Sequence, residues 1–281
     1  MTPSLRSLGQ GLSVLQGPLW QTNATLLEAG DDVVLVDPAQ FPDELAVLRA
    51  AVDRLQPERL WLLITHADFD HVQGIPIFPD GTVVAEAQTA QRLVDGRAAE
   101  GLRGAGRDLG ADWDDTLRAD RVVGFDVPER LGELELVAID AAGHQDHGAA
   151  FAFPGLGVLA AGDYLSAITY PFCIHGVAEA RASTERLLAA IEQHAIGTVI
   201  PGHGPVHDGA SATRIGTEDV RYLAALEAAA AEAAAQELPP AFALLHVFGV
   251  EPPRANTDDF EMYDLRGCNA RTALRAVGIA A

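Results

Sequence analysis

Residues 62–74, LLITHADFDHVQG, carry two histidines and two aspartates within six residues, directly after an apolar run. Burying carboxylates and imidazoles costs free energy unless they are paired or bound to a metal. A chain with this segment must therefore fold so that these side chains, at the end of a buried strand, pair with one another or bind a metal. We interpret the segment as a metal-binding loop.

The spacing within this loop predicts two neighbouring ions. Where the chain leaves a strand, residues two apart point the same way, so His66 and Asp68 can reach one ion. Asp70 and His71 begin the next helix and can face a second ion. Imidazole and carboxylate ligands suit zinc, iron or manganese, and no thiolate lies in this segment.

Three further motifs each follow an apolar strand and place one candidate ligand beside a glycine. They are Ala142-Gly-His144, Ala161-Gly-Asp163 and Pro201-Gly-His203-Gly-Pro205. Glycine lets the backbone turn sharply after a strand. The four motifs together offer seven candidate ligands, enough for two ions with positions left for water or substrate: His66, Asp68, Asp70, His71, His144, Asp163 and His203.

The motif order HxDxDH, GH, GD and PGHG resembles the metallo-β-lactamase superfamily, whose usual first motif is HxHxDH. The resemblance covers residues 12–205 and implies an α/β (α+β) fold, an αββα sandwich with the metals at one edge. It predicts a single domain of this type over residues 1–281. Its core would span about residues 12–210, and a helical C-terminal segment about residues 211–281.

Carried over by position, the resemblance also assigns roles to individual side chains. His66, Asp68 and His144 would hold the first metal, and the second would be held by Asp70, His71 and His203. Asp163 would bridge the two ions, and Asp70 and Asp163 would hold the attacking hydroxide as catalytic residues. Asp37, in the sequence Leu35-Val-Asp37-Pro, would support the metal ligands from behind.

Asp68 departs from the family pattern, which has histidine at this position. A carboxylate makes the first site harder and more anionic and so favours iron or manganese. We therefore expect two divalent ions, with zinc as the first expectation and iron or manganese left open by Asp68.

Three further side chains are weaker candidates. His147, in His144-Gln-Asp-His147, is either a hydrogen-bond donor behind the ligands, a proton shuttle, or a residue that orders the turn. Tyr164 and Tyr170 follow Asp163, and each either polarises a substrate carbonyl or packs in the core.

The predicted function is hydrolysis of an ester, lactone, thioester or phosphoester of a small molecule by a metal-bound hydroxide. An iron-dependent oxidoreductase or dioxygenase is the first alternative, favoured by Asp68. A metal-binding module without catalysis is the second alternative. It is disfavoured because all seven ligand positions carry a suitable side chain.

Composition restricts the kinds of partner that we expect this protein to bind. The net charge is −21 and the chain has no lysine, so its acidic surface disfavours nucleic acid. No apolar run is long enough for a membrane span, no signal peptide is recognisable, and the two cysteines form no disulfide framework. We expect a cytoplasmic protein with a small-molecule substrate and no membrane partner. The oligomeric state is left open, a dimer included.

Hydrophobic periodicity predicts the order of the elements. The pattern predicts a hairpin over 24–28 and 33–37, a helix from 43 to Pro57, and strands at 59–65 and 82–86. The segment 97–121 is predicted as a helical or loop insertion beside the active site. Further strands lie in 121–139, 149–161 and 197–201, and helices are expected at 179–194, 217–238 and within 239–281.

Overall fold

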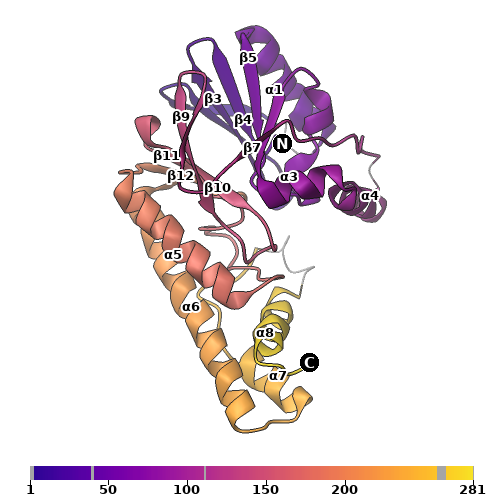
Figure 1. The fold of residues 1–281 in the computed structure, drawn as a ribbon, viewed down its shortest axis with the longest axis vertical. Coiled ribbons are helices and arrows are strands. Elements are labelled where there is room, and N and C mark those ends of the chain that lie inside the picture. Colours follow the sequence, from indigo (N-terminus) through magenta and orange to yellow (C-terminus); the bar gives the residue numbers. More distant parts are fainter. Residues whose placement is uncertain (1–2, 39–40, 111, 258–263, 281) are drawn as a thin grey trace.

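A computed structural model describes residues 3–38, 41–110, 112–257 and 264–280. Two β-sheets face each other, and helices cover the outer face of each (Figure 1). This is the αββα sandwich that the motifs predicted, so the predicted fold class is confirmed.

The first sheet is built by the N-terminal part of the chain. Its seven strands lie in sequence order: β1 Leu5–Gly9, β2 Leu12–Gln16, β3 Asn23–Ala29, β4 Asp32–Val36, β5 Arg59–Leu63, β6 Thr82–Glu86 and β7 Arg121–Val123. Strands β1 to β4 pair antiparallel, and β4 to β7 pair parallel. The periodicity predicted no strands before residue 24, so β1 and β2 were missed.

The second sheet has six strands in the order β13-β12-β11-β10-β9-β8. Their bounds are β8 Pro128–Leu131, β9 Leu134–Asp140, β10 Ala149–Phe153, β11 Val158–Ala160, β12 Thr198–Ile200 and β13 His207–Asp208. Strands β9, β11 and β12 run in the same direction, because β10 is antiparallel to both β9 and β11 and β12 is parallel to β11. Their carboxyl ends therefore meet at one edge of the sandwich.

The first sheet is covered by α1 Pro42–Leu55, α3 Ala87–Val94 and α4 Arg97–Leu109, and the second by α5 Val177–Gln193 and α6 Gly209–Ala235. The segment predicted as a helical or loop insertion thus contains helix α4. Helix α6 begins earlier than predicted, because the Asp208 carboxylate accepts a hydrogen bond from the Ser211 amide and caps it.

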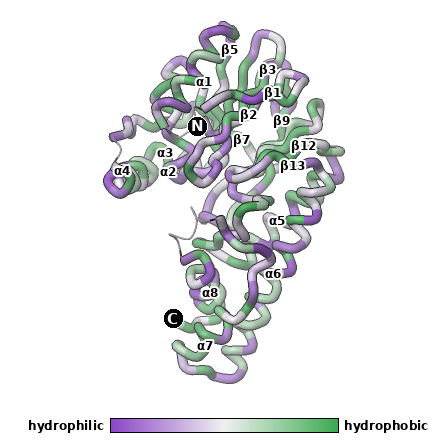
Figure 2. Tube along the Cα trace, turned by 180° about the vertical axis from the view of Figure 1, so that it is seen from behind, coloured by the Kyte–Doolittle hydropathy of each residue, from purple (hydrophilic) through white to green (hydrophobic). Residues whose placement is uncertain are grey.

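The remaining helices are α2 Phe69–Val72, α7 Pro240–Phe248 and α8 Leu265–Ala276, with short 3-10 turns at Ile75–Ile77 and Pro154–Leu156. Helices α7 and α8 pack on α6 at the end of the molecule remote from the first sheet (Figures 1 and 2). None of the helices in the described ranges is long and apolar enough to cross a membrane.

Three apolar clusters separate the layers. The cluster between the two sheets contains Val34, Leu63 and Val84 from the first sheet and Phe151 and Phe153 from the second, all buried. Alternate residues of the same strands face the helices, as the two-residue period of a strand requires. A strand buried on both faces reads as a nearly continuous apolar run, which is why Asp32–Val36 stood out in the sequence.

Asp32 is a buried carboxylate that ties the first sheet to the turn between β8 and β9. It accepts hydrogen bonds from the Arg59 guanidinium (2.6 and 2.8 Å), from Trp61 Nε1 (3.2 Å) and from the amide of Glu133 (3.3 Å). Burial would raise the pKa of Asp32, but these donors hold it below its ordinary value of 3.8. The ionised form is therefore the one that the fold stabilises.

We expect Asp32→Ala to lower the free energy of unfolding by about 2 kcal/mol, because three donors lose their acceptor while the half-exposed Arg59 is screened by water. Since the pKa is lower in the folded chain, this contribution is present above about pH 4 and is lost as the pH falls further. Urea unfolding between pH 7 and 3 should show the difference from wild type shrinking below pH 4. The exposed neighbour variant Asp31→Ala should show neither effect.

Candidate metal centre

Four histidines surround Asp163 at the edge where the strand ends meet. Asp163 Oδ2 lies 3.7 Å from His66 Nε2 and 3.4 Å from His144 Nε2. Its other oxygen, Oδ1, lies 3.2 Å from His71 Nε2 and 3.3 Å from His203 Nε2. One carboxylate thus faces two pairs of imidazoles, one pair with each oxygen.

The opposite ring nitrogen of each histidine faces a hydrogen-bond acceptor. His71 Nδ1 lies 3.0 Å from Asp37 Oδ2, His144 Nδ1 2.7 Å from the Phe172 carbonyl and His203 Nδ1 3.1 Å from the Trp20 carbonyl. His66 Nδ1 lies 3.0 Å from Thr65 Oγ1, whose proton is donated to Asp37. These acceptors place the proton of each neutral imidazole on Nδ1 and leave the Nε2 lone pairs directed at the centre.

The centre is therefore a buried group of acceptors. Among the described residues, His66 Nε2, His71 Nε2 and Asp163 Oδ1 are buried with no hydrogen-bond partner. Burial alone would lower the pKa of His144, but hydrogen bonding with Asp68 and the charges of Asp163 and Asp68 raise it to about 9, so that without an ion its Nε2 would bind a proton at neutral pH. Such a set is stable only with added positive charge, so the residues fit divalent cations held by imidazole and carboxylate.

The ligand atoms divide into two groups. Within the described residues, His66, His144 and Asp163 form one group, and Asp70, His71 and His203 form the other. The candidate ligand atoms of each lie within 4.8 Å of one another. Helix α2 supplies both Asp70 and His71, as the sequence predicted for the start of a helix.

Asp68 stands at the edge of the first group. Its Oδ2 lies 3.1 Å from His144 Nε2 and 3.6 Å from His66 Nε2. The side-chain amide of Gln145 donates to both oxygens of Asp68 at 2.9 Å. The carboxylate that stands in place of the usual histidine is therefore held by hydrogen bonds from Gln145.

Two glycines of the predicted motifs are required by close approach. At Gly143 φ is +124°, and an added Cβ would lie 2.2 Å from the backbone nitrogen of Ala180. At Gly202 an added Cβ would lie 2.4 Å from Asp163 Oδ1. The glycine before His203 therefore makes room for the central carboxylate rather than a sharp turn.

Asp37 lies behind both histidine pairs, where the resemblance placed it. Its Oδ1 accepts from the Thr65 amide (2.8 Å), and its Oδ2 accepts from Thr65 Oγ1 (2.6 Å) as well as from His71. Asp37 adopts φ +48°, a left-handed conformation that aspartate tolerates better than most residues.

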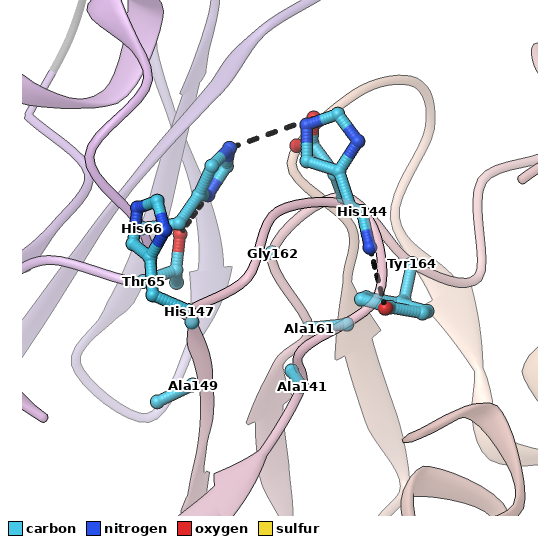
Figure 3. A pocket seen from close by; sticks show the side chains of 11 residues that line it. Thr65, His66, Ala141, His144, His147, Ala149, Ala161, Gly162 and Tyr164 are labelled. Atoms are coloured by element: carbon cyan, nitrogen blue, oxygen red, sulfur yellow. Dashed lines mark hydrogen bonds and ion pairs between the residues drawn. The ribbon is translucent and has the colours of Figure 1, made fainter. Parts of the chain in front are cut away.

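His147 and Tyr164 brace the loops that carry the ligands (Figure 3). His147 Nε2 accepts from the Ala67 amide (3.0 Å) while Nδ1 lies 2.8 Å from Asp146, and burial lowers the pKa of His147 to about 4. A neutral ring held at both nitrogens orders the turn, the third of its predicted roles. Tyr164 accepts from the His144 amide and donates to the Ala142 carbonyl.

Tyr170 does not reach the histidine cluster through any contact in the described residues. Its ring packs edge-on against Tyr222 at 5.6 Å, and Tyr170 also lines a small cavity together with Asp163 and His203.

The sequence did not single out Trp20, Phe172 or Gln145. Trp20 and Phe172 orient histidines through main-chain carbonyls, which every residue type provides and which leave no signature in the sequence. The unusual conformation of Trp20, φ +53°, also appears only in the structure.

Comparisons with known proteins give the same architecture. The profile of the metallo-beta-lactamase superfamily matches residues 17–203. A search of curated proteins gave no match. A metallo-beta-lactamase family protein from Thermus thermophilus is similar over 97% of this chain and 95% of its own, with 21% identity and a TM-score of 0.68.

Two further solved structures are similar. The stereoselective inverting sec-alkylsulfatase Pisa1 from Pseudomonas sp. matches 98% of this chain with 50% of its own, at 14% identity and a TM-score of 0.73. The metallo-beta-lactamase FIM-1 from Pseudomonas aeruginosa, in its mono-zinc form, matches 78% of this chain with 97% of its own, at 19% identity and a TM-score of 0.56. At these identities the likeness extends to the fold.

Proposed function

This chain belongs to the metallo-β-lactamase superfamily, and on that premise we propose that it is a metal-dependent hydrolase of a small molecule. The bond cleaved is an ester, lactone, thioester or phosphoester. The observation that carries the proposal is the convergence of four imidazole lone pairs on the two oxygens of Asp163.

In this proposal the seven candidate ligands would hold two divalent ions. His66, Asp68 and His144 would hold one ion, Asp70, His71 and His203 would hold the second, and Asp163 would contribute to both. Bound divalent ions acidify water and polarise the bond to be cleaved. Asp70 is buried beside His71 and His203 and lines the cavity in front of them, so its carboxylate can accept a proton from water and return it to the leaving group.

Metal content tests this proposal first. We expect about two zinc ions per chain in protein purified without chelators or added metal, measured by inductively coupled plasma mass spectrometry. Removal of the ions by a chelator should abolish hydrolysis of the substrates found in a panel of esters, lactones, thioesters and phosphodiesters. Readdition of zinc should restore it. Hydrolysis that persists in the metal-free protein would refute the proposal.

An iron-dependent oxidoreductase is the second candidate, and Asp68 is the observation that favours it. Its carboxylate replaces the usual histidine, and carboxylate-rich sites suit iron and manganese better than zinc. Recovery of iron in place of zinc, together with no hydrolysis of the panel, would make this candidate the leading one.

Asp68 is also the subject of a direct prediction. We expect Asp68→Ala to lower the bound metal to about one ion per chain, because His66 and His144 would be left with only the shared Asp163 as a further ligand. Asp68→His should retain both ions, since it restores a neutral ligand. Equal metal content in wild type and both variants would show that Asp68 is not a ligand.

A further inference from the structure

A cavity of about 250 Å³ opens directly in front of the candidate metal centre. Its floor is polar and includes Asp70 and Asp163, whereas its walls carry the apolar side chains of Trp20, Phe69, Phe172 and Ile174. A cavity of this kind binds a ligand by placing its polar group on the floor and its apolar part along the walls.

No arginine lines this cavity among the residues that the structure describes. A separate cavity of about 290 Å³ is lined by Arg92 and Arg97 and shares only Asp68 and Phe69 with the first. A charged group placed between the apolar walls would lose its water without gaining a partner, which is unfavourable. The occupant of the walled cavity is therefore uncharged.

The walls are held in place by their own contacts. The rings of Trp20 and Phe69 meet edge to face at 5.6 Å, and Phe69 stacks on Trp113 with ring centroids 6.1 Å apart. Phe172 packs against the His144 ring at 5.5 Å. An apolar surface fixed in this way loses little side-chain freedom when a ligand binds.

Two of the wall residues also orient candidate ligands through their main chain. Trp20 and Phe172 orient His203 and His144 through their carbonyl oxygens, while their rings line the cavity. Truncation of the Phe172 ring therefore changes the cavity and leaves the carbonyl that orients His144 in place. The two roles can be separated by mutation.

We propose that this cavity selects substrates with an uncharged alkyl or aryl group directly beside the bond that is cleaved. The inference rests on the proposed hydrolase function and narrows it to esters, lactones or thioesters of apolar acids. Polar or charged groups lie on the far side of the scissile bond.

The test is a series of p-nitrophenyl esters with straight acyl chains of increasing length, from acetate upwards. We expect kcat/KM to rise about three- to fourfold for each added methylene until the cavity is filled, as burial of one CH2 group implies. A carboxylate at the end of an acyl chain of equal length should cancel this gain. A rate independent of chain length, or raised by the carboxylate, would overturn the inference and direct attention to the cavity with Arg92 and Arg97.

Variants of the cavity walls test whether the dependence on chain length arises in this cavity. Phe172→Ala and Ile174→Ala should each flatten the dependence of kcat/KM on acyl chain length. Phe242→Ala should leave the whole series unchanged, because this exposed phenylalanine of α7 does not line the cavity. A slope that survives both cavity variants would contradict the assignment of the walls.

A binding measurement separates this inference from the proposed function. Uncharged 2-alkanones of increasing length should quench the tryptophan fluorescence of the metal-free protein, to which Trp20 of the cavity contributes, with affinity that rises with length and falls in Phe172→Ala. Length-dependent binding without hydrolysis of any ester, lactone, thioester or phosphodiester in the panel would support the cavity and refute the hydrolase. Hydrolysis with no dependence on length in either measurement would support the hydrolase and refute the cavity assignment.

Discussion

Replacing Asp163 with alanine is expected to lower kcat/KM at least about 100-fold on whichever substrate the panel identifies. The reason is geometric. Asp163 Oδ1 faces His71 and His203, and Oδ2 faces His66 and His144, so one truncation removes an oxygen from both ligand groups. Its carboxylate also supplies negative charge that would offset the charge of the two ions.

Steady-state kinetics and metal content should be measured on the same preparation, with circular dichroism to confirm that the variant is folded. Asp163→Asn keeps the size of the side chain and should lose nearly as much activity. Asp53→Ala removes an aspartate from an exposed ion pair on α1 and should retain full activity. An Asp163→Ala enzyme with wild-type rate and two bound ions would disprove the shared role of this carboxylate.

Much of the fold could be predicted because apolar runs and turn residues report directly on buried strands. Strand β6 was predicted with its observed bounds, and the hairpin of β3 and β4 within one residue at each end. Strand β1 was missed because its sequence, LRSLG, is mostly solvent-exposed and carries little apolar signal. Its place at the sheet edge is set by pairing with β2.

The residues of the candidate site likewise divide into those that the sequence predicts and those that it does not. Side chains with their own chemistry, such as His66 and Asp163, stand in short motifs at strand ends and could be predicted to converge. Groups that act through a main-chain carbonyl, or through contact with a residue distant in the sequence, could not be predicted. Gln145 meets Asp68 only because the loop after β9 folds against the loop after β5, and two loops 77 residues apart give no local pattern.

Replacing Asp37 with asparagine should have the second large effect, on metal affinity more than on folding. Asparagine keeps the shape, tolerates the left-handed backbone, and can still accept from the Thr65 amide. Its NH2 group, however, would stand where Asp37 Oδ2 now accepts from His71 Nδ1 and Thr65 Oγ1. The asparagine NH2 group would then face the N–H of His71 and the O–H of Thr65, so that three donors would meet with no acceptor between them.

His71 can relieve this conflict by moving its proton from Nδ1 to Nε2, which occupies the lone pair directed at the metal. Loss of such a supporting partner typically lowers metal affinity about 10- to 100-fold. Competition with a chromophoric chelator measures the affinity, and nitrogen chemical shifts of the imidazoles report the tautomer. Asp31→Asn, at an exposed position, should alter neither.

Asp37→Ala distinguishes a tautomer effect from simple loss of a contact. Alanine removes both acceptor oxygens but adds no donor. His71 can therefore keep its proton on Nδ1 and donate a hydrogen bond to a water molecule. We therefore expect metal affinity to fall in the order wild type, Asp37→Ala, Asp37→Asn, although asparagine is the smaller chemical change. The reverse order would mean that Asp37 acts through packing and charge, and that the proton on His71 is set by another group.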